Sequence, residues 1–208
     1  MSAPLKFVHE FVPGTSERTL LLLHGTGGDE HDLLPLGREI DPGAALLSPR
    51  GQVIENGQAR FFRRLAQGVF DVEDLKRRTD ALADFILDAA ERYRFDLAQL
   101  VAVGYSNGAN ITSSMLLRRP TLLRSAVLLR PMVPFEPISP PDLTGVRVWI
   151  GGGKEDMIIP RENTERLAAI LSAAGAEVTA HFFDGGHALT SVELVLVQRW
   201  LRATPPAA

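Results

Sequence analysis

A serine flanked by glycines stands between two segments of different periodicity. Residues 104–108 read Gly-Tyr-Ser-Asn-Gly, after the apolar run Leu100–Val103 and before a helix-like run, Ala109–Arg118. This is the G-x-S-x-G pattern in a strand–turn–helix context, where a sharp turn strains the serine backbone and exposes its Oγ. Glycine two residues before and two residues after the serine removes Cβ atoms that would clash in such a turn. The pattern predicts that Ser106 is the nucleophile of an acyl-transfer reaction.

A serine nucleophile needs a base that accepts its proton. When the serine lies in a G-x-S-x-G turn of this kind, the acid and then the histidine base follow it in the chain. Of five histidines, only His181 and His187 come after Ser106. His181 falls inside a strand pattern, Val178–Phe183, which favours a packing or surface role. His187 follows a Gly-Gly turn at the end of that strand, and a loop at this position can reach the serine. We therefore predict His187 as the base.

The third group of such a site is an acid that orients the histidine. A predicted strand, Val146–Ile150, leads into a polar segment that contains Glu155 and Asp156. We favour Asp156 because it directly precedes the apolar segment Met157–Ile159, which would bury it; the alternative is that it caps a helix. Asp184 is a rival, but it fits better as a turn former.

The negative oxygen that forms during acyl transfer needs two backbone N–H donors. One donor is predicted at Asn107, directly after the nucleophile. The strand-like run Leu20–Leu23 leads into His24–Asp29, with the sequence His-Gly-Thr-Gly-Gly-Asp, and we assign the second donor to the main chain of Thr26. His24 is expected to brace this loop. Neither phosphate-binding glycine motif is present, so the loop does not indicate a nucleotide site.

The walls of the substrate pocket are expected from apolar side chains in two long connections. The candidate pocket residues are Phe61, Phe62, Phe70, Met132, Val133 and Met157. The alternative is that such side chains fix their own loops to the core. Arg50, Arg63 and Arg64 could attract an anionic substrate, although exposed arginines are usually only solvated. The spacing of histidines and carboxylates matches no metal motif, so we expect no metal and no cofactor.

Short apolar runs alternate with helical periodicity, which predicts an α/β fold with a mostly parallel central sheet flanked by helices. We expect one α/β domain over residues 1–208, with its core at about 7–201 and a frayed C-terminal tail. The connection Arg130–Thr144 contains five prolines and is too short for a lid domain. The strands are expected at Leu20–Leu23, Ala44–Ser48, Leu100–Gly104, Ala126–Leu129, Val146–Ile150 and Val178–Phe183, with one more in Phe7–Val12.

Composition limits the class of protein. The chain has 208 residues, a net charge of −3 and no cysteine, which excludes disulfides and a cysteine nucleophile. Acidic and basic residues are mixed along the chain, so we expect no nucleic-acid partner. No apolar run reaches the length of a membrane span, and the N-terminus lacks the apolar stretch of a secretion signal. A cytoplasmic location is the expectation.

The chain resembles the compact bacterial phospholipase/carboxylesterase group of α/β-hydrolases, which also includes acyl-protein thioesterases. Within that group it is similar to the hydroquinone-stress hydrolase branch. The matching segments are His24–Gly28, Asp32–Leu36, Ser48–Gly51, Arg60–Arg64, Gly104–Asn110 and Gly185–His187. The resemblance implies a lid-less hydrolase of small carboxylic esters, with Ser106, Asp156 and His187 as the triad. Thioesterase members carry a hydrophobic residue at the position of Thr26, which argues against long acyl thioesters.

From these observations we expect a serine esterase that hydrolyses small or short-acyl esters. Two enzymatic alternatives are an acyl thioesterase and a lysophospholipase-like hydrolase. An alternative of another class is a non-catalytic hydrolase-fold protein that binds a small ligand. A dienelactone-type enzyme with a cysteine nucleophile is excluded by the absence of cysteine. The sequence does not decide between a monomer and a homodimer.

Overall fold

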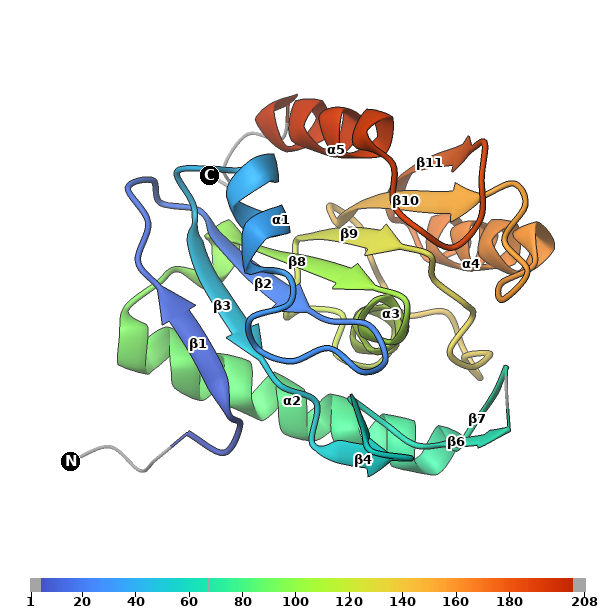
Figure 1. Cartoon of the computed structure of the whole chain (residues 1–208), viewed down its shortest axis with the longest axis horizontal. Helices are drawn as coiled ribbons and strands as arrows, with labels where there is room; N and C mark the ends of the chain where they lie inside the picture. The colour runs from blue at the N-terminus through green and yellow to red at the C-terminus, as the bar shows by residue number, and fades with distance from the viewer. Residues whose placement is uncertain (1–4, 67, 204–208) are drawn as a thin grey trace.

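A seven-stranded sheet forms the centre of the protein (Figure 1). The computed structural model describes residues 5–66 and 68–203. The strands follow the order β1-β3-β2-β8-β9-β10-β11; β1 is antiparallel to β3, and the remaining pairs are parallel. Their bounds are His9–Val12 for β1, Thr19–Leu23 for β2, Ala45–Pro49 for β3, Leu100–Tyr105 for β8, Ser125–Leu129 for β9, Arg147–Gly153 for β10 and Glu177–Phe183 for β11. All seven strands expected from the sequence are confirmed, to within a few residues at their ends.

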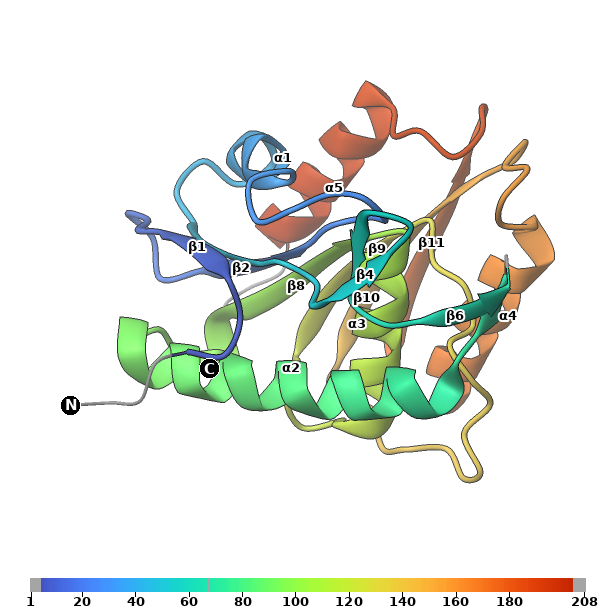
Figure 2. The ribbon, with the colours of Figure 1, turned by 60° about the horizontal axis from the view of Figure 1, so that its bottom comes forward.

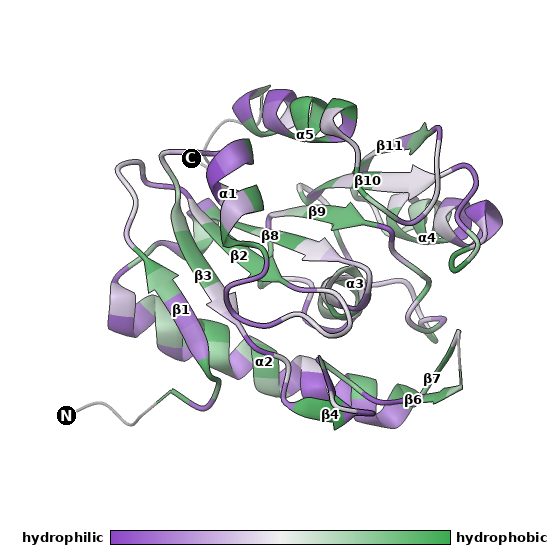
Figure 3. Ribbon diagram, in the orientation of Figure 1, coloured by the Kyte–Doolittle hydropathy of each residue, from purple (hydrophilic) through white to green (hydrophobic). Residues whose placement is uncertain are grey.

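Alternate side chains of each strand enter two different cores, because successive residues of a strand point to opposite faces. In β2, Leu21 and Leu23 pack into one core, whereas Leu20 and Leu22 pack into the other. All four leucines are fully buried. This explains why the central strands are continuous apolar runs, as is typical of parallel sheets covered on both faces. In Figure 3, strands β2, β8 and β9 are correspondingly hydrophobic.

Five α-helices cover the two faces of the sheet. Their bounds are Leu34–Ile40 for α1, Val72–Tyr93 for α2, Asn107–Arg118 for α3, Arg161–Ala173 for α4 and Ser191–Ala203 for α5. Residues of α2, α3 and α4 belong to one core, and residues of α1 and α5 belong to the other. Figure 2 shows these two groups of helices on opposite sides of the sheet. The chain therefore has the three-layer arrangement expected from its sequence.

The segment between β3 and α2 is a long connection, but it has regular structure of its own. It contains two short hairpins, formed by β4 (Val53–Glu55) with β5 (Gln58–Arg60) and by β6 (Arg64–Ala66) with β7 (Val69–Phe70). Strands of two or three residues are too short to show a hydrophobic period in the sequence. Helix α1 was also not predicted, because its seven residues are too few for a clear helical pattern.

The proline-rich connection between β9 and β10 is too short for a lid domain, as expected from the sequence. Residues 130–144 are all described, and they contain neither helix nor strand. A lid domain therefore has no place in this connection. Among the described residues, no helix combines the length and the hydropathy needed to cross a membrane. Most of the predicted C-terminal tail, residues 204–208, lies outside the described part of the chain.

The packing of α2 generates a stability prediction. Ile86 is fully buried in the core beneath the sheet, whereas the next residue, Leu87, is 40% exposed. Ile86→Ala should lower the free energy of unfolding by about 2–5 kcal/mol, because it removes buried methyl groups and leaves a cavity. The matched control Leu87→Ala should cost less than about 1 kcal/mol. Urea unfolding followed by circular dichroism measures both, and equal losses would contradict the assigned face of α2.

Candidate active site

Ser106 occupies the turn between β8 and α3 with a left-handed backbone, at φ 51° and ψ −110°. A Cβ on Gly104 would lie 2.6 Å from the nitrogen of Ala109, and a Cβ on Gly108 would lie 1.9 Å from the carbonyl oxygen of Leu23. Real side chains do not tolerate such contacts. Both glycines of the motif are therefore required by the geometry, as the sequence predicted for this turn.

The three residues predicted as the triad form one continuous hydrogen-bonded chain. Nε2 of His187 lies 3.0 Å from Oγ of Ser106, and Nδ1 of His187 lies 2.8 Å from Oδ2 of Asp156. Ser106 follows strand β8, Asp156 follows β10 and His187 follows β11. These strands lie close together in the sheet, in the order β8-β9-β10-β11, and their carboxyl ends meet at one edge. This is the geometry in which a histidine can take the serine proton while a carboxylate fixes its tautomer.

Asp156 is buried, with a side chain only 1% exposed. Burial favours its neutral form, but His187 and the backbone N–H groups of Ile159 and Ile158 stabilise the charge, and together they lower its pKa. Its Oδ1 accepts hydrogen bonds from the N–H groups of Ile158 (2.8 Å) and Ile159 (3.0 Å). The carboxylate is thus held ionised by backbone donors. The apolar segment does not cover it with side chains in the way we expected, because Met157 is 93% exposed.

The other acidic candidate is placed away from the histidine ring. Asp184 is exposed and pairs with the ammonium group of Lys154 at 2.7 Å. His181 lies in β11, as predicted, and its ring packs near Trp149 with centroids 5.7 Å apart. Neither residue belongs to the hydrogen-bonded chain that contains Ser106.

The glycine-rich loop after β2 lies beside Ser106, and Thr26 and Asn107 line the same cavity as this serine. Asn107 is the first residue of α3, so its N–H has no partner within the helix. His24 is buried; its Nδ1 lies 2.6 Å from the carbonyl oxygen of Gly25, and its Nε2 accepts from the N–H of Gly51 at 2.9 Å. Burial lowers the pKa of His24. His24 thus connects the glycine-rich loop after β2 with the segment after β3, as expected for a residue that holds this loop in place.

The loop that carries His187 is held by a network that the sequence did not indicate. Arg130 donates from Nε to the carbonyl oxygen of Gly186 at 3.2 Å and from Nη2 to that of Ala188 at 2.7 Å. The hydroxyl of Tyr105 donates to the carbonyl oxygen of His187 at 3.1 Å. Three consecutive carbonyl groups are therefore fixed by side chains from the end of β8 and the residue after β9.

Arg130 is itself fixed by a buried ion pair with Glu193. Its Nη1 and Nη2 lie 2.7 and 3.0 Å from the two carboxylate oxygens, and the two side chains are 1% and 0% exposed. The carboxylate fills the space beside Gly151, where a Cβ would lie 2.2 Å from Oε1 of Glu193. Glu193 also forms a capping box with Thr190 at the start of α5. No local pattern joins residues 63 positions apart, so sequence reasoning missed this pair.

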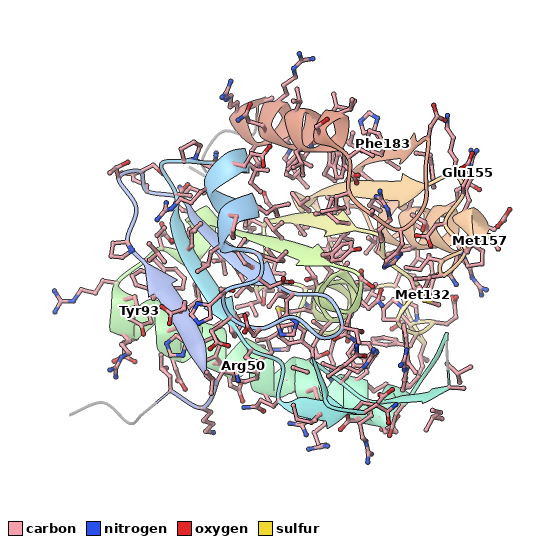
Figure 4. All side chains as sticks on the ribbon, in the orientation of Figure 1. Arg50, Tyr93, Met132, Glu155, Met157 and Phe183 are labelled. Atoms are coloured by element: carbon pink, nitrogen blue, oxygen red, sulfur yellow. The ribbon has the colours of Figure 1, made fainter. Side chains whose placement is uncertain are left out.

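A cavity of about 320 Å³ opens over Ser106 and His187. Two of the predicted pocket residues, Phe70 and Met132, line it, and Met132 lies between α3 and α4 in Figure 4. The other lining residues are Thr26, Gln58, Arg60, Arg64, Gly68, Tyr105, Asn107, Asn110, Ile158 and Ile159. Six of these side chains were not proposed as pocket residues, because the hairpin and loop geometry that turns them inward leaves no local signal in the sequence. They are Gln58, Arg60, Tyr105, Asn110, Ile158 and Ile159.

Four predicted pocket residues lie elsewhere. Phe61 and Phe62 are 2% and 0% exposed and belong to the core between the sheet and α2. Val133 also packs against that core, whereas Met157 projects into solvent. For Phe61, Phe62 and Val133 the alternative interpretation was correct: these side chains fix their own loops to the core.

Of the three arginines considered from the sequence, two lie outside the cavity and one lines it. Arg50 pairs with Glu30, and Arg63 pairs with Asp71 at 2.8 Å. Neither Arg50 nor Arg63 lines the cavity, and Figure 4 shows Arg50 far from Met132. Arg64 does line it.

Replacement of Arg130 tests the network around the histidine loop. Arg130→Met should destabilise the protein by about 3–5 kcal/mol, because it leaves the carboxylate of Glu193 buried without its partner. Arg161→Met is the matched control, since it breaks an arginine–glutamate pair whose side chains are 50% and 45% exposed; its cost should stay below about 1 kcal/mol. Urea unfolding of the two variants makes the comparison, and equal costs would contradict a structural role for the buried pair.

Comparison with known proteins agrees with this site. Residues 50–193 match the model of the dienelactone hydrolase family. MhqD of Bacillus subtilis (strain 168), a protein named as a hydrolase, is 50% identical over 194 residues, which cover 93% of this chain and 97% of MhqD.

Two solved carboxylesterases have the same fold. That of Bacillus cereus is 46% identical, with a TM-score of 0.93 over 95% of this chain and 94% of the other. That of Mesorhizobium loti is 36% identical, with a TM-score of 0.88 over 92% and 91% of the two chains. The resemblance to bacterial carboxylesterases drawn from the sequence is thus confirmed. The chain belongs to the dienelactone hydrolase family and has the α/β-hydrolase fold, with a serine at the turn between β8 and α3.

Proposed function

We propose that this hydrolase is a serine carboxylesterase that cleaves small, short-acyl esters through an acyl-enzyme. The observation that carries the proposal is the hydrogen-bonded chain from Ser106 through His187 to Asp156 at the strained turn. A protein that merely binds a ligand has no need to maintain a left-handed serine in contact with an oriented histidine. The carboxylesterases of Bacillus cereus and Mesorhizobium loti, related at 46% and 36% identity, support the ester as substrate.

The first half of the reaction forms the acyl-enzyme. His187 takes the proton of Ser106 through Nε2 while Oγ attacks the ester carbonyl carbon. Asp156 accepts a hydrogen bond from Nδ1 and stabilises the imidazolium, without being protonated itself. The oxyanion is bound by the backbone N–H groups of Thr26 and Asn107. His187 then gives its proton to the departing alcohol.

The second half releases the acid. Water enters the place of the alcohol and loses a proton to His187 as it attacks the acyl carbonyl. The same two N–H donors bind the second oxyanion. When it collapses, the bond to Oγ of Ser106 breaks and the histidine returns the proton to the serine. The network of Arg130 and Tyr105 keeps the histidine loop in one position through both halves.

The size of the cavity supports short acyl groups. Its volume is about 320 Å³, at the small end for ligand pockets. Phe61 and Phe62 fill the core instead of opening a channel, and the connection at residues 130–144 adds no lid that would enclose a long chain. A long acyl chain would have to leave the cavity and lie against the surface.

Labelling with a fluorophosphonate tests the nucleophile. The probe should modify Ser106 with a stoichiometry of about one, and His187→Ala should abolish the label because the serine is then no longer activated. Mass spectrometry locates the modified residue. In ester hydrolysis, Ser106→Ala and His187→Ala should each lower kcat by about 10⁴–10⁶-fold, and Asp156→Asn somewhat less. Absence of label on folded protein would overturn the catalytic proposal in favour of ligand binding.

Acyl-chain dependence tests the substrate size. The value of kcat/KM should be higher for butyryl than for dodecanoyl 4-nitrophenyl esters, because the longer chain gains no buried surface in this cavity. Both esters are compared below their micelle-forming concentrations, with release of 4-nitrophenol as the readout. A preference for the dodecanoyl ester would contradict a short-acyl enzyme.

A further inference from the structure

One amide side chain in the wall of the catalytic cavity has hydrogen-bond donors that the proposed reaction does not use. Asn110 lies in α3, one helical turn after Ser106, and its backbone N–H donates to the carbonyl oxygen of Ser106 at 3.0 Å. It lines the cavity together with Ser106, although it is only 4% exposed. Side chains of a helix point back toward its N-terminus, so the amide of Asn110 is directed toward the turn that carries the serine.

The orientation of this amide is fixed by the connection that follows β9. Oδ1 of Asn110 accepts from the backbone N–H of Met132 at 2.7 Å. A backbone N–H can only donate, so the oxygen of the amide faces Met132 and the NH2 group faces another direction. Within residues 5–66 and 68–203, no acceptor is bound to Nδ2 of Asn110. The two N–H donors of this group are therefore available to a ligand.

Nδ2 of Asn110 reaches open space. In the described part of the chain, side-chain nitrogens that are enclosed and lack a partner occur at Arg78, Asn107 and Arg147, and Asn110 is not among these residues. The open space beside Asn110 is the catalytic cavity, so water can bind Nδ2 in the free enzyme. A substrate that fills the cavity without an acceptor displaces this water and leaves the donors unpaired, which weakens its binding.

The part of the ester that passes Asn110 follows from the groups around the reacting carbon. In the proposed mechanism the oxyanion faces Thr26 and Asn107, and the alcohol lies beside His187, which protonates it. The acyl chain is left with the remaining wall of the cavity, which includes Asn110 and Met132. The free NH2 group therefore faces the acyl chain.

We infer that the acyl chain of the substrate carries an uncharged oxygen, as an ether, hydroxyl or ketone, that accepts a hydrogen bond from Nδ2 of Asn110. The inference rests on the proposed function, because it concerns the substrate of the same serine. An amide is a neutral donor, and it fits a neutral acceptor without a change of charge in the cavity. A site built around such a donor discriminates against an analogue that lacks the oxygen. Asn110 is thus a specificity-determining residue.

The test compares two 4-nitrophenyl esters of the same length. The 3-methoxypropanoyl ester has an ether oxygen where the pentanoyl ester has a CH2 group. The kcat/KM of each ester is divided by its rate constant for hydrolysis by hydroxide, which removes the difference in intrinsic reactivity. For the wild type, the corrected ratio of the ether ester to the alkyl ester should be about three- to tenfold, the range of one neutral hydrogen bond. A corrected ratio of one or less would overturn the inference without the need for a variant.

Asn110→Asp removes the donors and keeps an oxygen that accepts from Met132. Its corrected ratio should fall to about one or below, mainly through a higher KM for the ether ester, because the ether is bound equally before and during the reaction. The added carboxylate acts on both esters, so its effect on the serine and the histidine cancels in the ratio. If this variant does not fold, Asn110→Leu, which has a similar size and no side-chain N–H, takes its place with the same expectation. A purely structural role of Asn110 would leave the ratio as in the wild type, and this result would overturn the inference.

Asn163→Asp is the matched control. Asn163 of α4 holds the next residue of the same connection, since its Oδ1 accepts from the N–H of Val133 at 2.7 Å. Asn163 is not one of the described residues that line the cavity. Its replacement adds the same charge at an equivalent contact, so the corrected ratio should stay as in the wild type. An equal fall in the two aspartate variants would mean that the connection as a whole sets the ratio, and it would overturn the role assigned to Asn110.

Failure of the inference and failure of the proposed function give different results. If both esters are hydrolysed and Ser106 is labelled by the fluorophosphonate, a corrected ratio of one or less removes the inference alone. If neither ester is hydrolysed, the inference fails, and only the additional absence of label on Ser106 overturns the esterase function as well.

Discussion

Helix α3 approaches the end of strand β2 so closely that a Cβ on Gly108 would lie 1.9 Å from the carbonyl oxygen of Leu23. This contact sets the position of the first turn of α3 against the sheet. It also brings the residue before the helix, Ser106, next to the loop that follows β2, where Thr26 lies. The predicted nucleophile and its predicted oxyanion donors are thus placed by one close packing of backbone on backbone, which only glycine permits.

The histidine side of the site depends on a different interaction, the buried pair of Arg130 and Glu193. Desolvating two charges is expensive, and such pairs contribute less to stability than their geometry suggests. Here the guanidinium also serves the carbonyl groups on both sides of His187. The pair therefore fixes one conformation of the glycine-containing loop that carries His187. A hydrophobic replacement of similar volume has no donors to offer these carbonyl groups.

The substrate side is built from the two short hairpins between β3 and α2. Arg60 of the first hairpin donates to Thr26 in the glycine loop, and the next residue, Phe61, donates to Asn107. Arg64 of the second hairpin pairs with Glu55 of the first, so both arginines are held in place although the strands are short. Residues of both hairpins line the cavity together with Ser106 and with Asn107 and Asn110 of α3. Variation of this segment can change the charge of the cavity without disturbing the seven-stranded sheet, because the sheet does not pair with either hairpin.

The sequence by itself determined the sheet, the helix that follows Ser106 and the hydrogen-bonded chain of Ser106, His187 and Asp156. Apolar strands and amphipathic helices have local periods, and the glycines around Ser106 and before His187 report local backbone geometry. The cavity wall was decided only by tertiary structure. Phe61 and Phe62 were predicted in the pocket but lie in the core, whereas Arg60 and Arg64 face the cavity. Which side chains of this short segment turn inward depends on hydrogen bonds to residues such as Thr26 and Asn107, which lie more than thirty positions away in the chain. Such contacts leave no periodic trace in the amino-acid sequence.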